Sequence, residues 1–210
     1  MAYLILVRHG QSTWNLKGTW TGWNDVDITK QGEEEAKEAA RIIKKLTIRI
    51  DKTYQSDLKR AQQTLDILKR ELGIESIPTV TNAAIKERDY GVYAGKNKWE
   101  IKKEVGDETF LKIRRSWDYP IPEGENLKQV WERVAPYYDT VILPDLEKGL
   151  NVLVSAHGNS LRALVKHLDN VSPEEVTGLN IGTGEVYVYQ IDTDGTIMKK
   201  DIYKVNTQDQ

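Results

Sequence analysis

Two of the three histidines in this chain, His9 and His157, follow the same kind of segment. Each comes directly after a short, largely apolar run, residues 3–7 or residues 151–155, and each is followed by a glycine. Continuous apolar runs of this length indicate strands buried on both faces, as in parallel sheets. Because the carboxyl ends of parallel strands meet at one edge of an open α/β sheet, where ligands bind, we expect both imidazoles to face one crevice.

A neutral imidazole at such an edge is a competent nucleophile toward phosphorus when a hydrogen bond to its other ring nitrogen fixes the tautomer. Phosphoryl transfer also needs in-line positioning and positive charge around the phosphate oxygens. Arg8 adjoins His9, and Arg60 lies near the start of an expected helix, so both guanidinium groups could bind the same phosphate. These residues favour phosphoryl transfer through His9, with no metal required.

Transfer through a phosphohistidine also needs a group that protonates the departing alkoxide. Glu87 is the preferred carboxyl group, because it lies in a polar loop after an expected strand. Spacing alone leaves Asp57, Asp89 and Glu125 as competitors.

Other interpretations of the histidines stay open at this point. His9 and His157 could be hydrogen-bonded core residues, or they could bind a hydrolytic zinc ion with a carboxylate, although no His-x-x-x-His pair is present. His167, on an expected helix, is interpreted as a surface or packing residue. Trp20 or Trp23, in the first loop, could shape the mouth of the crevice.

The composition limits the class of protein. The 210 residues predict a single domain over residues 1–210, large enough to bury a core. The absence of cysteine excludes disulfides, thiolate catalysis and cysteine-bound metals. A net charge of −2 gives no general attraction to nucleic acid or anionic membranes. With no leader-like or membrane-length apolar run, we expect a cytoplasmic protein without nucleic-acid or membrane partners.

The periodicity of apolar residues predicts how strands and helices alternate. Strands are expected at residues 3–7, 52–55, 78–84 and 151–155, and helices at residues 33–46, 57–72, 99–105, 109–117, 127–146 and 160–168. Ser56 is the expected N-cap of the second helix, and Pro136 and Pro144 are expected to disturb the helix at 127–146. The Asp194-Gly195 turn predicts a terminal hairpin of residues 185–191 and 196–203. This order predicts a three-layer α/β/α sandwich on a mostly parallel sheet.

Several segments together resemble the histidine phosphatase superfamily, and within it the cofactor-dependent phosphoglycerate mutases, which use 2,3-bisphosphoglycerate. The first segment is LVRHGQSTWN at residues 6–15. The others are TGWND at 21–25, SDLKRA at 56–61, ERDYG at 87–91, GKNK at 95–98, RRS at 114–116, AHGNSLRA at 156–163 and LNIGTG at 179–184. The resemblance extends over nearly the whole chain, and the TGW, NK and RRS blocks distinguish the mutases from general phosphatases.

The resemblance implies a phosphoglycerate-mutase-like fold and an isomerase of glycolysis and gluconeogenesis that interconverts 2- and 3-phosphoglycerate. By this resemblance, His9 is the phosphorylated nucleophile and Glu87 the proton donor and acceptor, while His157, Arg8 and Arg60 stabilise the transferring phosphoryl group. The implied substrate-binding residues are Ser12, Asn15, Thr21, Gly22, Arg88, Tyr90, Lys98, Arg114, Arg115, Gly158 and Asn159. It further implies that 2,3-bisphosphoglycerate primes the phosphoenzyme, that no metal is used, and that the protein is a monomer or a small homo-oligomer.

The sequence departs from the family pattern at Asp89, where histidine is usual, and in the short connection from Ser116 to Glu125. The main alternative function is a histidine phosphatase acting on bisphosphoglycerate or other phosphomonoesters, since fold and nucleophile are common to both. A phospho-ligand-binding module without turnover is a second alternative, although it would have no use for a proton donor.

Overall fold

The computed structural model describes residues 1–205, whose six strands form one sheet in the order β3-β2-β4-β1-β5-β6. The strands are β1 (Ala2–Arg8), β2 (Lys52–Gln55), β3 (Thr79–Thr81), β4 (Val152–Ala156), β5 (Val186–Ile191) and β6 (Ile197–Tyr203). Neighbouring strands from β3 to β1 are parallel, whereas β5 pairs antiparallel with both β1 and β6. The structure confirms the mostly parallel sheet and the terminal hairpin.

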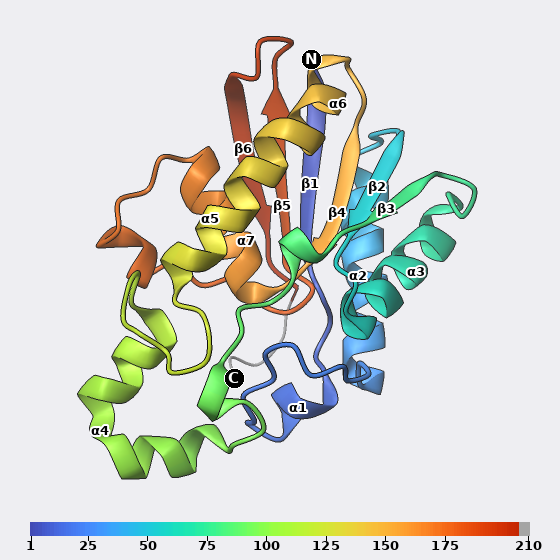
Figure 1. Ribbon diagram of the computed structural model, residues 1–210. Coiled ribbons are helices and arrows are strands. Elements are labelled where there is room, and N and C mark those ends of the chain that lie inside the picture. The colour runs from blue at the N-terminus through green and yellow to red at the C-terminus, as the bar shows by residue number, and fades with distance from the viewer. Residues whose placement is uncertain (206–210) are drawn as a thin grey trace.

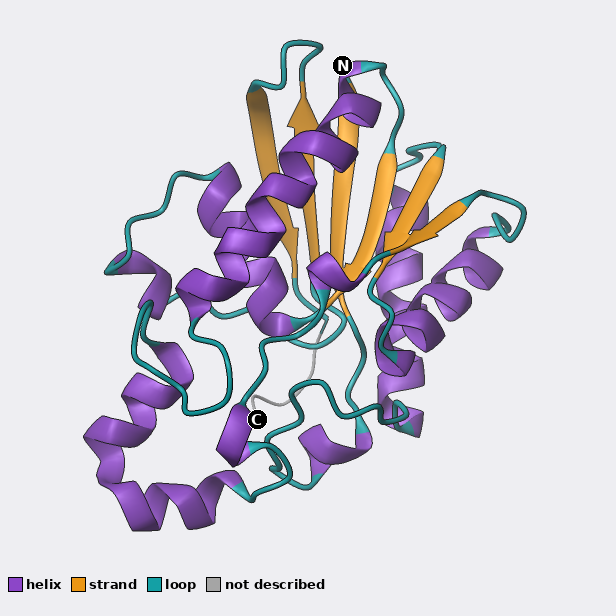
Figure 2. Cartoon of the chain, viewed as in Figure 1, coloured by secondary structure: helices purple, strands orange, loops and turns teal. Residues whose placement is uncertain are grey.

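Helices cover both faces of this sheet and form the other two layers (Figures 1 and 2). One face is covered by α5 (Leu127–Tyr137), α6 (Leu143–Glu147) and α7 (Gly158–Leu168), and the other by α2 (Lys30–Lys45) and α3 (Lys59–Leu72). The short α1 (Thr13–Leu16) and the longer α4 (Lys98–Arg115) lie beyond the carboxyl ends of the parallel strands (Figure 1). The three-layer α/β/α prediction is therefore confirmed.

The central strand β1 is buried on both faces, which explains its continuous apolar sequence. Leu4 and Leu6 pack toward the layer of α5, α6 and α7, while Ile5 and Val7 pack toward α2 and α3. All four side chains are fully buried. Because side chains alternate along a strand, both faces of β1 require apolar side chains until the strand ends at Arg8, which His9 follows.

The loop after β1 is held against α2 by a contact between two glycines. A β-carbon on Gly10 would lie 2.1 Å from the Gly32 carbonyl oxygen, and one on Gly32 would lie 2.3 Å from the Gln11 oxygen. Gly32 lies in the first turn of α2, which is capped by the Thr29 side chain accepting from the Gly32 N–H at 3.1 Å. The start of α2 therefore sets the path of the chain just after His9.

Helix α4 is anchored by an apolar cluster separate from the two main core clusters. It consists of Trp20, Ile101, Phe110, Ile113 and Ile121. The helix is kinked at Gly106, whose φ of 78° lies in the left-handed region that favours glycine. The two helices predicted at 99–105 and 109–117 are the two arms of this one kinked element.

Two local predictions are wrong, a third is right in part, and one element was not predicted. The strand predicted at 78–84 is shorter, and residues 83–85 form a 3₁₀ turn; β3 is an edge strand, paired with β2 alone. Ser56 does not cap α3; its hydroxyl accepts from the Leu58 N–H, and the Lys59 N–H is bonded to distant Asp25 at 2.7 Å. The helix predicted at 127–146 is disturbed, as expected, by a π turn at Tyr138–Ile142 just before Pro144, which lies at the start of α6. Pro136, by contrast, lies inside α5. Finally, α1 was not expected.

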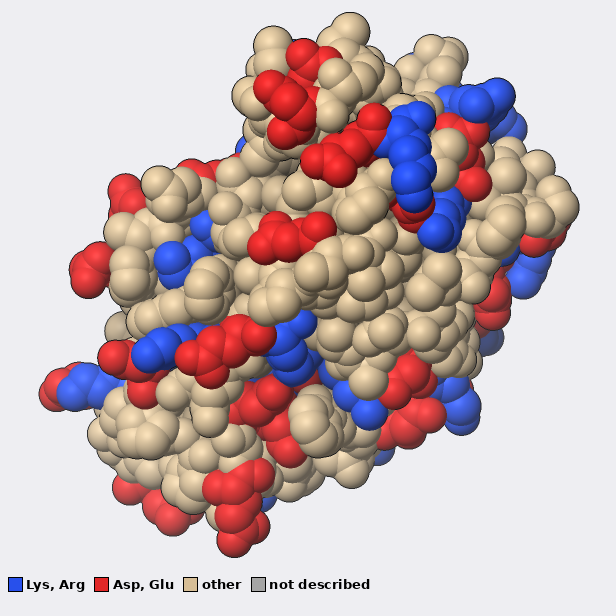
Figure 3. All heavy atoms as spheres, turned by 45° about the horizontal axis from the view of Figure 1, so that its top comes forward, with Lys and Arg blue, Asp and Glu red and all other residues tan. Residues whose placement is uncertain are grey.

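The surface is charged but mixed in sign. On the face shown in Figure 3, lysine and arginine side chains lie among aspartate and glutamate side chains, with a wide uncharged area between these groups. No helix within residues 1–205 combines the length and apolar character needed to cross a bilayer.

The glycine contact leads to a first prediction, for the substitution Gly32→Ala. Helix propensity alone would favour alanine at this position, but its β-carbon would overlap the Gln11 oxygen. We expect the substitution to lower the free energy of unfolding by about 1 to 3 kcal/mol, measured by urea denaturation. The control is Gly178→Ala, where the new carbon would lie 3.6 Å from its nearest neighbour, the Glu175 oxygen. Equal stability of both variants would contradict the packing argument.

Candidate active site

The two histidines meet at the carboxyl edge of the sheet, as the sequence predicts. Strands β1 and β4 are parallel neighbours with Arg8 opposite Ala156, and the His9 N–H donates to the Ala156 oxygen at 2.9 Å. The two rings lie with centroids 5.0 Å apart and planes inclined by 59°. The register of one strand pair therefore brings together residues 9 and 157.

The tautomer of His9 is fixed by its own loop. Its Nδ1 lies 2.7 Å from the Gly10 carbonyl oxygen, which can only accept, so Nδ1 carries the proton and Nε2 has a free lone pair. The ring is 2% exposed. Burial, followed by the charges of Arg60 and Arg8, holds the pKa of His9 well below its ordinary value. His9 is therefore a neutral imidazole with a nucleophilic nitrogen.

His157 is fully buried beside His9, at the N-cap of α7. Within the described residues, neither of its ring nitrogens has a hydrogen-bond partner. Burial, then the charges of Arg60 and Arg8, lower the pKa of His157 well below the ordinary value. Buried polar atoms without partners are rare, so these nitrogens are available to a ligand.

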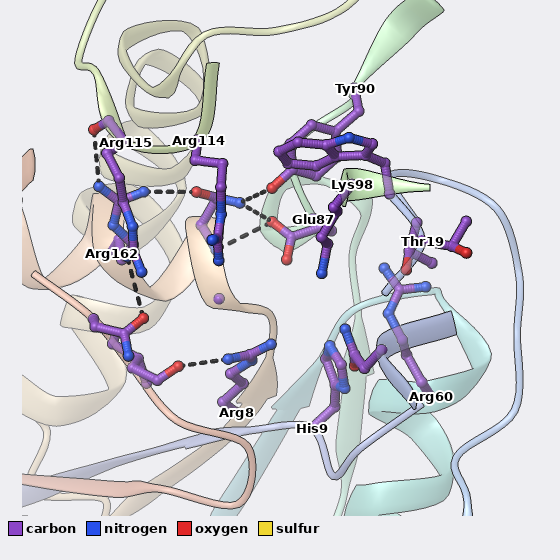
Figure 4. A pocket seen from close by; sticks show the side chains of 17 residues that line it. Arg8, His9, Thr19, Arg60, Glu87, Tyr90, Lys98, Arg114, Arg115 and Arg162 are labelled. Carbon is purple, nitrogen blue, oxygen red and sulfur yellow. Dashed lines mark hydrogen bonds between the residues drawn. The ribbon is translucent and has the colours of Figure 1, made fainter. Parts of the chain in front are cut away.

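A pocket opens at this edge, and its walls are strongly cationic (Figure 4). Six cationic side chains line it, namely Arg8, Arg60, Lys98, Arg114, Arg115 and Arg162. Glu87 is the one carboxylate among its lining residues. Such an excess of positive charge in a concave site is suited to a ligand with more than one anionic group.

The guanidinium groups are positioned largely by main-chain carbonyl oxygens. Arg60, on α3 and 1% exposed, donates to the oxygens of Gly22 at 2.8 Å and Asn24 at 3.0 Å. Arg8 donates to the Ile181 oxygen at 2.6 Å. Because burial is only weakly offset by nearby acids, it lowers the pKa of Arg60 to about 10.

Burial and neighbouring positive charges also lower the pKa values of cations on other helices. Burial, then the charges of Arg114 and Arg8, lower the pKa of Lys98 to about 8. Burial, then the charges of Arg88 and Arg115, lower the pKa of Arg162 to about 9. Both shifts have the direction expected for cations that lack an anionic partner.

Glu87 lies on the loop between β3 and α4 and is 7% exposed. Its Oε1 accepts three hydrogen bonds, from the Arg88 N–H at 2.7 Å, the Asn159 N–H at 3.1 Å and the Asn159 Nδ2 at 3.0 Å. Within the described residues its Oε2 accepts none. A β-carbon on Gly158 would lie 3.7 Å from this oxygen and 3.4 Å from Arg8 Nε. Gly158 therefore adjoins both the acid and the arginine, at ordinary van der Waals distances.

The structure brings most of the predicted site residues together. Those that line the pocket are Arg8, His9, Asn15, Thr21, Arg60, Glu87, Tyr90, Lys98, Arg114, Arg115, Gly158 and Asn159. His157 does not line the pocket; its ring packs against that of His9, which does.

Three predicted substrate-binding residues do not line the pocket but support residues that do. Ser12 Oγ accepts from the Asn15 N–H at 3.1 Å, and the Gly22 oxygen accepts from Arg60. Arg88 is 1% exposed and donates to the Ile113 oxygen in α4 at 2.9 Å. Its guanidinium therefore holds α4 in place instead of facing the pocket.

Sequence reasoning missed other lining residues: Thr19, Arg162, Asn180 and Ile181. Trp20, considered for the mouth of the crevice, is also part of the wall. The signal for Arg162 is its place in the AHGNSLRA segment, one turn after Asn159, to whose Oδ1 it donates at 2.8 Å.

A metal could in principle be held here. Ligand atoms of His9, Glu87 and His157 lie within 4.8 Å of one another, and all three residues are buried. The geometry alone therefore permits the zinc alternative, whereas the positive charge of the neighbouring arginine and lysine side chains opposes a divalent cation.

Comparison with known proteins identifies the family. The profile of the histidine phosphatase superfamily, branch 1, matches residues 4–201. The chain belongs to this superfamily. It is 48% identical over 199 residues to the 2,3-bisphosphoglycerate-dependent phosphoglycerate mutase of Parvibaculum lavamentivorans, covering 95% of both chains. It is 47% identical to the enzyme of that name from Bradyrhizobium diazoefficiens, covering 94% of this chain and 95% of the relative.

Solved structures with lower identity share the fold. YhfR of Bacillus stearothermophilus superposes with a TM-score of 0.81 at 23% identity, covering 94% of each chain. A mycobacterial glucosyl-3-phosphoglycerate phosphatase superposes with a TM-score of 0.80 at 21% identity, covering 99% of this chain and 100% of the other.

The two buried imidazoles predict how stability depends on pH. Their pKa values are lowered on folding, so below the ordinary value of 6.5 the unfolded chain binds more protons than the folded one. Stability is therefore greatest above that pH and falls as the pH drops. Between pH 7.5 and 5.5 we expect the pair to account for a loss of about 2 to 3 kcal/mol in the free energy of unfolding.

This loss is measured by urea denaturation at the two pH values. Few carboxyl groups titrate in this interval, because their ordinary pKa values lie near 4. The double variant His9→Gln, His157→Gln should lose most of the dependence. A wild-type protein equally stable at both pH values would contradict the burial of two neutral imidazoles.

Proposed function

We propose that this protein is a 2,3-bisphosphoglycerate-dependent phosphoglycerate mutase, an isomerase of glycolysis and gluconeogenesis acting through phospho-His9. The observation that carries the proposal is the pocket with six cationic side chains above a neutral, tautomer-fixed imidazole. One phosphoryl group does not require that many cations, whereas a ligand with a carboxylate and one or two phosphates does. The names of relatives nearly half identical over almost the whole chain support the same substrate.

In the proposed reaction, His9 Nε2 attacks the phosphorus of a bound phosphate ester in line with its leaving oxygen. The N–P bond forms as the P–O bond breaks, and Glu87 gives its proton to the departing alkoxide. Arg8, Arg60 and His157 would stabilise the charge on the phosphoryl oxygens. 2,3-Bisphosphoglycerate supplies the first phosphoryl group when it binds.

In the productive cycle, the free hydroxyl of a bound monophosphoglycerate attacks the phosphorus of phospho-His9, the N–P bond breaks and Glu87 accepts the hydroxyl proton. The bisphosphoglycerate so formed reorients, and its other phosphoryl group returns to His9 by the first step. The substrate's remaining groups would be held by Lys98, Arg114 and Arg115, with Asn15, Thr21, Tyr90, Gly158 and Asn159 close by. Ser12, Gly22 and Arg88 would act by supporting these contacts. Water must be kept from phospho-His9 whenever the phosphoryl group is on the enzyme, since its attack would make the protein a phosphatase.

We also propose that no metal takes part. Arg8 and Arg60 lie close enough to His9 and His157 to lower the pKa of both rings, and these fixed charges oppose a divalent cation at the same place. They favour a phosphate instead, which neutralises them. With such substrates we infer a cytoplasmic location, with small phosphoglycerates rather than nucleic acid or membranes as partners.

A parallel assay tests the proposed function. Isomerisation of 3-phosphoglycerate and release of inorganic phosphate are measured on the same samples, with and without trace 2,3-bisphosphoglycerate and a chelator. We expect isomerisation to exceed phosphate release, to be activated by the bisphosphate and to survive chelation. Phosphate release far in excess of isomerisation would favour the phosphatase, and strict dependence on added metal would contradict the metal-free site.

The roles of His9 and Glu87 are tested by substitution. His9→Ala removes the nucleophile, so isomerisation and acid-labile phosphate labelling should be lost together. Glu87→Gln keeps the shape but cannot donate a proton, so transfer to and from the alkoxide should slow by about 100-fold or more. Acid-labile label persisting in the His9→Ala protein would show that another residue is phosphorylated.

A further inference from the structure

The main chain that carries Glu87 is held by an arginine from a different layer of the fold. Arg133, on α5, donates from Nη1 to the Ala84 oxygen at 2.7 Å and to the Lys86 oxygen at 3.0 Å. From Nη2 it donates to the oxygen of Glu87 itself at 2.9 Å. One guanidinium therefore bonds to three carbonyls within four consecutive residues of the acid loop.

The orientation of Arg133 is fixed in turn by Glu125. The two side chains form a bidentate pair, with Nε to Oε1 at 2.8 Å and Nη2 to Oε2 at 2.8 Å. Glu125 also bonds to the loop at Asp89. Its Oε2 accepts from the Asp89 N–H, and its main-chain N–H donates to the Asp89 carbonyl oxygen, both at 2.9 Å. Planar, paired contacts of this kind restrict rotation of a guanidinium much more than a single ion pair does.

A second side chain also donates to the carbonyl oxygen of Glu87. Trp23 Nε1 donates to the Glu87 oxygen at 2.7 Å. The Glu87 side chain is held separately, through the three bonds at Oε1. Main chain and side chain are thus both fixed, and Oε2 is the Glu87 oxygen left to reach a ligand.

We propose that Arg133 is a positioning residue for proton transfer by Glu87, with Glu125 and Trp23 completing the arrangement. The proposal rests on the function proposed above, in which Glu87 protonates the departing alkoxide. General acid catalysis requires the acid within hydrogen-bond reach of the leaving oxygen, and a displacement of about 1 Å can cost 100-fold in rate. Arg133 does not line the pocket, and its hydrogen bonds reach the Glu87 loop. Its charge also contributes to lowering the pKa of His157, and a lysine at this position keeps that charge.

The leaving group of the phosphate donor separates this role from general structural support. An alkyl phosphate such as 2,3-bisphosphoglycerate needs a proton on its departing oxygen, whereas p-nitrophenyl phosphate releases a stable phenolate without one. Both donors would form the same bond from His9 Nε2 to phosphorus. Single-turnover labelling of excess enzyme measures this step alone for each donor.

The variants are Arg133→Lys, which keeps the charge but loses the planar fork, and Trp23→Phe, which removes the second donor at the Glu87 oxygen. Trp23 is 44% exposed, so its replacement leaves the core intact. The matched control is Arg41→Lys, whose guanidinium pairs with Glu38 on the exposed surface of α2 at 2.6 Å. Thermal unfolding of each variant accompanies the kinetics.

We expect Arg133→Lys to slow labelling from 2,3-bisphosphoglycerate by about 10- to 100-fold and labelling from p-nitrophenyl phosphate by less than about threefold. Trp23→Phe should change the two rates in the same direction, by a smaller factor. Arg41→Lys should change neither. Equal slowing with both donors, or no slowing with either, would overturn the positioning role.

Failure of the positioning role can be told apart from failure of the proposed function. If the protein is not a mutase, the wild-type protein fails in the isomerisation assay, before any variant is compared. If it is a mutase but Arg133 only stabilises the fold, the variant loses thermal stability and the ratio of the two labelling rates stays at the wild-type value.

Discussion

The guanidinium groups around His9 are buried with main-chain carbonyl oxygens as partners rather than carboxylates. Arg60 is held by Gly22 and Asn24, Arg8 by Ile181, and Arg162 in part by Val176 at 2.8 Å. A carbonyl satisfies the hydrogen-bonding capacity of a guanidinium without cancelling its charge. The charge stays available for a phosphate, and the fold has to supply a carbonyl at each of these places. The loop after α1 supplies the oxygens of Gly22 and Asn24, the segment before β5 supplies that of Ile181, and the 3₁₀ turn after α7 supplies that of Val176.

This arrangement also determines the protonation of the two imidazoles. With Arg8 and Arg60 close by and water largely excluded, protonation of His9 or His157 would add a further positive charge to a cationic, poorly solvated site. The imidazoles therefore stay neutral, which is the state that the proposed role of His9 as a nucleophile requires. A phosphate bound beside Arg8 and Arg60 would offset their positive charge and so make a proton on His157 less unfavourable.

The site residues that come directly after strands could be predicted from sequence, whereas contacts between residues far apart in the chain could not. His9 and His157 were placed correctly because a buried parallel strand is a continuous apolar run and its end is visible in the sequence. Arg162 was missed because it lies among buried apolar residues of an ordinary amphipathic helix, and only the fold brings the Val176 carbonyl to it. Arg88 shows the converse: the resemblance assigns it to the substrate, but α4 turns its last carbonyls toward it. The cap of α3 by Asp25 spans 34 residues and has no local signal.

Helix α4 links the choice of substrate to a small part of the fold. Its first residue, Lys98, and its last two, Arg114 and Arg115, all line the pocket, although a straight helix would carry its two ends well apart. The kink at Gly106 folds the two arms toward each other, and Trp20 packs against Phe110 with ring centroids 6.0 Å apart. Trp20 lies in the segment after α1, the short helix that carries Asn15. The cations proposed for the second anionic group are therefore positioned by an apolar cluster outside the main core. Changes in that cluster can alter what the enzyme binds while the sheet, the histidines and the phosphoryl site stay in place, which gives a physical reason why mutases and phosphatases can share one scaffold.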